Sequence, residues 1–135
     1  MRLWILVVMT SLLVTTLMSL SPVHAKETNC TECGMMVMMD SKFTSKITQG
    51  DSPIYFCDIG DLFTYLKKKN VQDARIEVKD YTSGEWIDAR KAFYVKSGKK
   101  FATPMGWGIA AFKDKNEASQ SGTVVDFESS AKAWK

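Results

Sequence analysis

An internal repeat is the sequence feature that most limits how this chain can fold. It appears when the 135-residue chain is compared with itself at an offset of 46 residues, which places Tyr55 on Phe101 and Gly60 on Gly106. Repeats of this length are usually single supersecondary units that bury their apolar faces against one another. The chain is therefore expected to contain two similar units of strands and helix.

The first unit is predicted to run strand, strand, helix, strand. Alternating side chains around residues 45–48 and a returning segment at 54–56 flank a turn signal that contains Gly, Asp and Pro. Asp58 is placed to cap a helix whose apolar side chains recur at helical spacing as far as Leu66. Residues 75–79 are expected to form the closing strand.

The second unit is expected to follow the same order. Strands are predicted at residues 92–95 and 100–102. The pair Thr103-Pro104 has the pattern of a helix cap followed by proline at the first helical position, so a helix is predicted from Met105 to about Lys113. A strand at residues 123–127 would close the unit.

These elements predict an α+β fold in which two ββαβ pseudo-repeats pack as one small domain. The domain is expected to span residues 26–135, with approximate halves at 33–80 and 85–127. About 110 residues are enough for one modest hydrophobic core. Few residues are identical between the halves, so chance similarity of two strand–helix–strand stretches is the alternative interpretation.

Residues 1–25 have the composition of a secretory signal peptide. A positively charged start precedes an apolar run over residues 3–20 and a small-residue cleavage site that ends at Ala25. The alternative is a retained membrane anchor, but Ser and Thr within the run and the proline before the cleavage site favour removal. A lipid anchor at Cys30 is not expected, because polar residues precede it. The mature protein is therefore predicted to be periplasmic, without a membrane span.

The predicted cleavage removes the only histidine of the chain, His24. Its loss excludes histidine acid–base catalysis, Ser-His-Asp triads and every metal site that needs an imidazole ligand. The formal net charge of +3, with interspersed signs, argues against a nucleic-acid surface. No catalytic constellation is left, so the chain is not expected to be an enzyme.

Two thiols and four thioethers lie in the ten residues from Cys30 to Met39, and three interpretations of this sulfur are open. An exported protein can join two of its three cysteines in a disulfide and keep one thiol. Cys30 and Cys33 also form a C-x-x-C pair, which could exchange disulfides with the cysteines of a partner. The third interpretation is a soft-metal site, since Cu(I) prefers thiolate and thioether donors and accepts two or three of them.

The individual methionines and cysteines are expected to have different roles. Met36, Met38 and Met39 are each expected to pack, because methionine is a common filler of cores. Cys57 lies just before a predicted helix, where the helix dipole would favour its thiolate; the alternative is a small buried apolar residue. Gly34 would let neighbouring sulfurs bend toward one ion.

Several segments together resemble a known family. They are Cys33-Gly34-Met35, Phe56 to Gly60, Asp80 to Ala89 followed by Ala92 to Val95, and Thr103 to Gly106 followed by Ala111-Phe112. In this order and at these spacings they resemble the NosL family, the accessory proteins of nitrous-oxide reductase. The resemblance covers nearly the whole mature chain.

The resemblance implies a ββαβ repeat architecture and a copper chaperone that carries Cu(I) to the apo form of nitrous-oxide reductase. Transferred to this sequence, it implies that Cys33, Met35 and Met105 are the copper ligands. Cys30 has no firm counterpart in the family, and relatives often have an acidic residue where Cys57 stands, so these two are secondary candidates. The alternative function is a thiol–disulfide oxidoreductase that acts through Cys30 and Cys33 on the copper-site cysteines of a partner.

Overall fold

The protein is described by a computed structural model that covers residues 28–134. The predicted signal peptide, residues 1–25, lies outside the described residues. Within the described part, no helix has the length and apolar character needed to cross a membrane.

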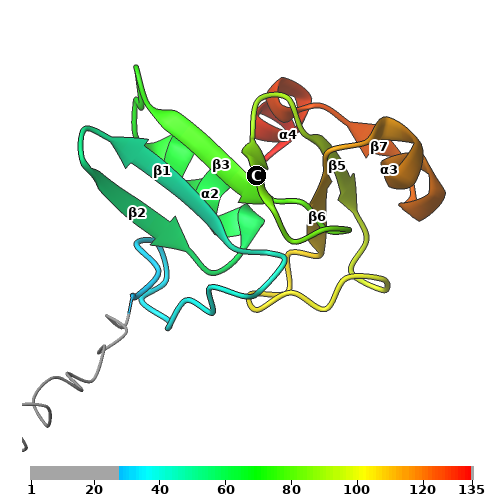
Figure 1. The fold of residues 1–135 in the computed structure, drawn as a ribbon, viewed down its shortest axis with the longest axis horizontal. Helices are drawn as coiled ribbons and strands as arrows, with labels where there is room; N and C mark the ends of the chain where they lie inside the picture. The colour runs from blue at the N-terminus through cyan, green and yellow to red at the C-terminus, as the bar shows by residue number, and fades with distance from the viewer. Residues whose placement is uncertain (1–27, 135) are drawn as a thin grey trace, which may run out of the picture.

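The first half of the domain is a four-stranded antiparallel sheet with one helix. The strands have the order β2-β1-β3-β4, so β1 pairs with both β2 and β3 (Figure 1). Their bounds, with that of the helix, are β1 Ser45–Gln49, β2 Ser52–Phe56, α2 Ile59–Lys68, β3 Arg75–Lys79 and β4 Trp86–Asp88. The strands, turn and helix predicted for the first unit are confirmed.

The second half repeats this connectivity in a smaller, three-stranded antiparallel sheet. Its strand order is β6-β5-β7, so the first strand of the unit is again central. The elements are β5 Phe93–Lys96, β6 Ile109–Phe112, α3 Lys115–Ser121, β7 Val124–Val125 and a further helix, α4 Phe127–Ala133. Both halves therefore follow the order ββαβ, and the predicted α+β fold of two pseudo-repeats is confirmed.

The helix predicted from Met105 to about Lys113 is wrong. The first part of this segment is a loop, and β6 occupies most of its second half. Gly106 and Gly108 have φ angles of +73° and +66°, which a right-handed helix does not contain. Every residue of β6 is buried, and a short apolar run of this kind suits a strand covered on both faces as well as a helix. The helix of the second half instead begins after Asp114, whose carboxylate caps it.

Two further elements of the second half differ from the prediction. Residues 100–102 form no strand and belong to the long connection between β5 and β6. The closing strand, predicted over residues 123–127, is reduced to β7, because Asp126 accepts a hydrogen bond from the Ser129 backbone and starts α4. The offset of 46 residues therefore aligned β2 with a loop and α2 with the region of β6.

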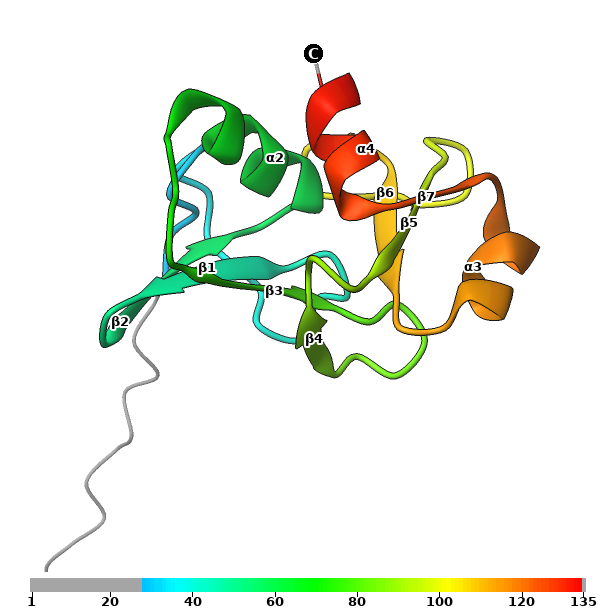
Figure 2. The ribbon, with the colours of Figure 1, turned by 90° about the horizontal axis from the view of Figure 1, so that it is seen from above.

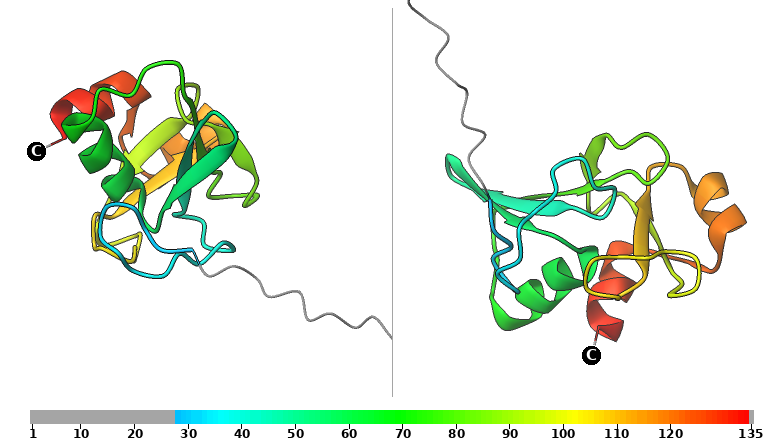
Figure 3. Two further views of the ribbon diagram at one scale, coloured as in Figure 1. Left: turned by 90° about the vertical axis from the view of Figure 1, so that its left-hand side faces the viewer. Right: turned by 90° about the horizontal axis from the view of Figure 1, so that it is seen from below.

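Helix α2 connects the two halves through its apolar face. Asp58 caps it by accepting a hydrogen bond from the Gly60 backbone, and the first turns are buried. The ring of Phe63 lies 5.4 Å from that of Tyr94 on β5 and 5.5 Å from that of Trp134 after α4. Helices α2 and α4 lie next to each other on one side of the sheets, with α3 at the far end of the second sheet (Figures 2 and 3). Both halves thus share one core.

Asp80 joins the two sheets where β3 ends. Its buried carboxylate accepts hydrogen bonds from the backbone and hydroxyl of Ser83, at 2.8 and 2.7 Å, and from the Lys113 backbone beyond β6, at 2.9 Å. Burial alone would raise the pKa of Asp80, but the hydrogen bonds more than offset this and hold the pKa below its usual value. The carboxylate is therefore charged in the native protein at neutral pH.

Replacing this carboxylate should weaken the contact between the sheets. We expect Asp80→Ala to lower the free energy of unfolding by about 2–4 kcal/mol near neutral pH, because three partly buried hydrogen bonds lose their charged acceptor. A lowered native pKa contributes stability that is present at neutral pH and lost as the pH falls through it, so the difference from wild type should shrink in acid. Urea unfolding of both proteins at neutral pH and at acidic pH measures this difference. Glu85→Ala, in the same turn but exposed, is the control, and an equal loss there would contradict the assignment.

Candidate metal site

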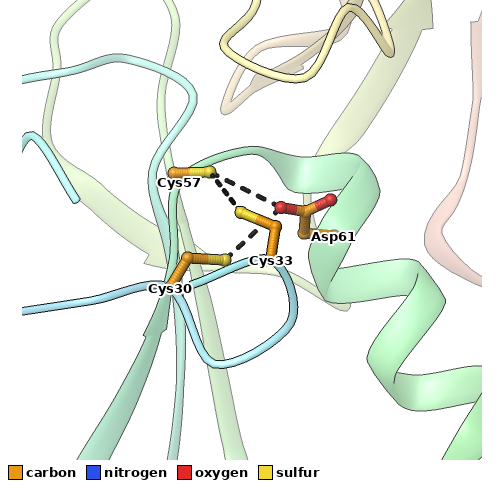
Figure 4. A group of neighbouring side chains, drawn as sticks. All are labelled: Cys30, Cys33, Cys57 and Asp61. Carbon is orange, nitrogen blue, oxygen red and sulfur yellow. Dashed lines mark hydrogen bonds between the residues drawn. The ribbon is translucent and has the colours of Figure 1, made fainter. Parts of the chain in front are cut away.

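Three thiols and one carboxylate meet beside the start of α2. They belong to Cys30, Cys33, Cys57 and Asp61, here called the thiol cluster, and their ligand atoms all lie within 4.8 Å of one another (Figure 4). The Sγ atoms of Cys33 and Cys57 are 3.4 Å apart. The thiols of Cys30 and Cys57 donate hydrogen bonds to Asp61 Oδ2 over 3.3 and 3.5 Å. All three cysteines are free thiols.

A tight loop brings the first two thiols to the cluster. The Cys30 backbone N–H donates to the Met35 carbonyl at 2.7 Å, and the Gly34 N–H donates back to the Cys30 carbonyl at 2.9 Å. Gly34 has a φ of +77°, which a side chain would disfavour, so glycine closes this loop at low cost. The Thr31 N–H bonds the Tyr55 carbonyl on β2, and Glu32 forms an ion pair with Lys68 at the end of α2. The loop is thereby fastened to both neighbouring elements.

The start of α2 supplies the other half of the cluster. Cys57 directly precedes the capping residue Asp58. Asp61 lies four residues after Cys57, so the side chains of Cys57 and Asp61 face the same side of the first turn. Figure 4 shows Cys57, just before α2, and Asp61, on its first turn, pointing toward the two thiols of the loop. The sequence analysis missed Asp61. The sequence signal that could have identified Asp61 is its spacing of four residues from Cys57 at the start of a predicted helix.

Trp107 holds Asp61 from the opposite side. Its indole Nε1–H donates to Asp61 Oδ1 at 3.0 Å, so the two carboxylate oxygens divide between the indole and the thiols. The indole lies on the backbone of Gly60, where an added Cβ would be only 2.2 Å from the ring. The ring of Trp107 is also 4.8 Å from that of Trp134. The cluster is thus covered by an aromatic side chain from the loop that precedes β6.

Burial governs the acidity of the cluster. Cys57 is nearly inaccessible, and burial raises its pKa well above the usual thiol value; its hydrogen bond with Cys33 and its electrostatic interactions with Cys30 and Asp61 add to this. The pKa of Cys33 is also raised by burial, although the Met35 backbone N–H and the Cys57 thiol partly offset the effect. The expectation that the helix dipole would favour the Cys57 thiolate is wrong, because desolvation is the larger effect. Cys57 is buried, yet it has polar partners and is not simply packing.

The two methionines predicted as ligands lie beside the cluster. The Met35 carbonyl closes the loop of Cys30, and the Met105 backbone N–H donates to Asp58 Oδ2 at 3.0 Å. The Met105 loop is therefore attached to the start of α2, next to Cys57. Both methionine side chains are exposed. The contacts that place Met35 and Met105 here come from the backbone, whereas the three cysteines meet through their sulfur atoms.

The expectation that Met36, Met38 and Met39 pack in the core is wrong. All three side chains are exposed. The core is built instead from aromatic and branched side chains, which fill it without them.

A family model described as NosL matches residues 22–131. The chain belongs to the NosL family. No functionally curated protein matches it. Among solved structures, this NosL-family chain is similar to the crystal structure of the copper chaperone NosL from Shewanella denitrificans, with a TM-score of 0.61 and 22% sequence identity, over 74% of this chain and 87% of that one. The likeness supports the fold.

The cluster of this NosL-family chain is suited to holding a metal ion. Three atoms no more than 4.8 Å apart lie within about 2.8 Å of a common point, close to a metal–sulfur bond of about 2.3 Å. Small side-chain rotations would therefore bring the three sulfurs onto one ion. Among residues 28–134 no other group of three or more Cys, Asp or Glu ligand atoms converges in this way.

Proposed function

We propose that this protein is a metallochaperone that binds one Cu(I) ion tightly at the thiol cluster and delivers it to a copper enzyme. The observation that carries the proposal is the convergence of the Cys30, Cys33 and Cys57 sulfurs from two separate segments of the chain. The relative from Shewanella denitrificans is described as a copper chaperone, which supports the same class of cargo.

The donor chemistry favours Cu(I) over harder ions. Thiolate and thioether donors select Cu(I), whereas imidazole and carboxylate suit harder divalent ions. The cluster offers three sulfurs and a single carboxylate, and that carboxylate already accepts a hydrogen bond from Trp107. A structural zinc site would use four Cys or His ligands, and the cluster has three. A three-sulfur environment therefore matches the low coordination number of Cu(I).

The three thiols differ in exposure, and this difference favours transfer of the metal by ligand exchange at one of them. Cys30 and Cys57 are buried, with 3% and 2% of their surfaces exposed, while Cys33 is partly accessible. An incoming ligand would therefore meet the metal at Cys33. Met35 and Met105, whose side chains are exposed, are proposed to complete the ligand set with Cys33 while the ion is handed over. Thioethers are neutral and resist disulfide formation, which suits them to an oxidising compartment.

The recipient and the compartment are part of the proposal. The resemblance to the NosL family implies that apo nitrous-oxide reductase receives the copper, and the signal-like residues 1–25 imply that this happens in the periplasm. In this role the protein carries its metal cargo and catalyses no reaction.

Thiol–disulfide exchange is the competing function, and one contact favours it. The Sγ atoms of Cys33 and Cys57 are in contact at 3.4 Å, so oxidation could join these two thiols in a disulfide. Burial, however, raises the pKa of both Cys33 and Cys57, and a protonated thiol is a poor nucleophile. The electrostatics of the cluster therefore disfavour a fast redox catalyst and are compatible with slow, metal-coupled deprotonation.

An anaerobic competition titration tests the proposed function. The reduced, exported form, residues 26–135, is titrated with Cu(I) against a chromophoric Cu(I) chelator, and the loaded protein is then mixed with apo nitrous-oxide reductase. We expect one tight equivalent of Cu(I) and its appearance in the reductase. Apo-reductase incubated with the same amount of chelator-bound Cu(I) is the control. Failure to compete with the chelator, together with catalysis of disulfide exchange on a model substrate, would overturn the proposal.

A further inference from the structure

Every methionine within residues 28–134 has an exposed side chain. Six large hydrophobic side chains are exposed among residues 28–134, and five of them are methionines, with 40–56% of their surface accessible. The sixth is Val125. No Leu, Ile or Phe is among them, although these residues are frequent in the core. Methionine is therefore placed at the surface selectively, so its sulfur, not its apolar character alone, is the property to explain.

Four of these methionines follow the cysteine loop in a segment with a well-defined backbone. Met36 forms an antiparallel bridge with Asn29, and the Val37 N–H donates to the Thr28 carbonyl at 2.8 Å. The Met38 carbonyl accepts a hydrogen bond from the Thr44 hydroxyl, also at 2.8 Å. These contacts hold the main chain while the methionine side chains stay in water.

The burial pattern places two of the thioethers on one side of this segment. Val37 is buried with 6% of its surface exposed, while Met36 and Met38 on either side of it are exposed. In extended backbone, residues two apart point to the same side and lie about 7 Å apart. Methionine has three rotatable side-chain bonds, so two sulfurs at this spacing can reach one ion between them. Met39 stands at the following turn and can supply a third.

We propose that Met36, Met38 and Met39 form a second, weaker Cu(I) site made of thioethers only. The site goes beyond the proposed tight site, since none of its ligands belongs to the thiol cluster. Thioethers need no deprotonation, so this site can collect Cu(I) without the proton release that buried thiols require. Met35 connects the two sites along the chain, and its backbone N–H and carbonyl contact Cys33 and Cys30. The exposed site would load the buried one.

Methyl NMR tests this assignment directly. The exported form contains five methionines, so protein labelled with ¹³C at the methionine methyl groups should give five signals, assigned by single Met→Leu variants. Cu(I) is added anaerobically, with Ag(I) as a redox-stable parallel probe. We expect the first equivalent to leave the signals of Met36, Met38 and Met39 unchanged and the second equivalent to shift them.

The variant Met36→Leu/Met38→Leu/Met39→Leu separates metal binding from protein docking. Leucine keeps the apolar surface and removes the sulfur, so we expect affinity for the second equivalent to fall at least about tenfold with the first unchanged. Met105→Leu is the matched control and should leave the second equivalent intact. Unchanged binding of the second equivalent, or shifts confined to Met35 and Met105, would overturn the second site and indicate a protein-docking surface. Wild-type protein that binds Cu(I) at Met36, Met38 and Met39 but shows no tighter equivalent would overturn only the proposed function.

Discussion

The apparent affinity of this protein for Cu(I) is expected to rise steeply with pH, by at least about 100-fold per pH unit between about pH 6 and pH 8. The reason is that burial raises the pKa of both Cys33 and Cys57 above the usual thiol value. Below a raised pKa the thiol is protonated in the metal-free protein, and Cu(I) has to displace that proton to bind the thiolate. Each displaced proton contributes about a factor of ten per pH unit, and two thiols release two protons.

The slope of this dependence identifies the ligands. Chelator competition at several pH values gives the apparent constant, after correction for protonation of the chelator itself. A slope of two in the logarithm of affinity against pH supports two or more thiol ligands. Thioethers do not titrate, so a slope of one would point to the ligand set Cys33, Met35 and Met105, and a pH-independent affinity would contradict any thiol ligand at the tight site. Met105→Leu should leave the slope unchanged, because it removes no proton.

Cys33→Ser is expected to weaken Cu(I) binding at least about 100-fold. Structural metal sites with four ligands have apparent binding free energies of about 10–16 kcal/mol, so one sulfur ligand contributes about 3 kcal/mol, which corresponds to roughly this factor. Cys33 is central to both candidate ligand sets. Its Sγ contacts that of Cys57, and its loop carries Met35. Removing it should therefore damage tight binding and transfer together.

The control for this variant lies in the same loop. Thr31→Ala changes an exposed side chain between the two cysteines and leaves its backbone hydrogen bond to Tyr55 in place, so its Cu(I) affinity should equal that of wild type. Cys57→Ser should reproduce the loss seen with Cys33→Ser if the thiol cluster is the tight site. Wild-type affinity in Cys57→Ser, combined with a loss in Met105→Leu, would favour the ligand set Cys33, Met35 and Met105.

Asp61 connects metal binding to the aromatic cover. Its Oδ2 accepts hydrogen bonds from two thiols, while Oδ1 accepts one from Trp107. When the thiols lose their protons to bind a metal, Asp61 loses those two donors and keeps only the indole. The carboxylate would then be free to join the metal or to turn away from the negative sulfurs, with the hydrogen bond from Trp107 as its remaining contact of this kind. The indole is therefore placed to respond to the state of the cluster.

Local patterns were sufficient for the first half of the fold and insufficient for the second. The turn signal before β2, the capping Asp58 and the apolar spacing of α2 agree with one another, so prediction and structure coincide there. In the second half, a Thr-Pro cap pattern competed with an apolar run at residues 109–112. Pairing of that run with β5 decided in favour of a strand, and this pairing depends on contacts with residues distant in sequence.

The sequence by itself determined the donor chemistry: three cysteines, five methionines and no histidine after residue 25, in a chain with a ββαβ order and an export-like start. Only the tertiary structure decided which donors meet. Cys57 joins Cys30 and Cys33 because α2 begins beside the N-terminal loop, and Asp61 enters because a helical turn places it next to Cys57. The acidity of the thiols was likewise decided by burial, which outweighs the helix dipole. Sequence carries the types of ligand, but their distances and solvation arise from long-range packing, which no local pattern encodes.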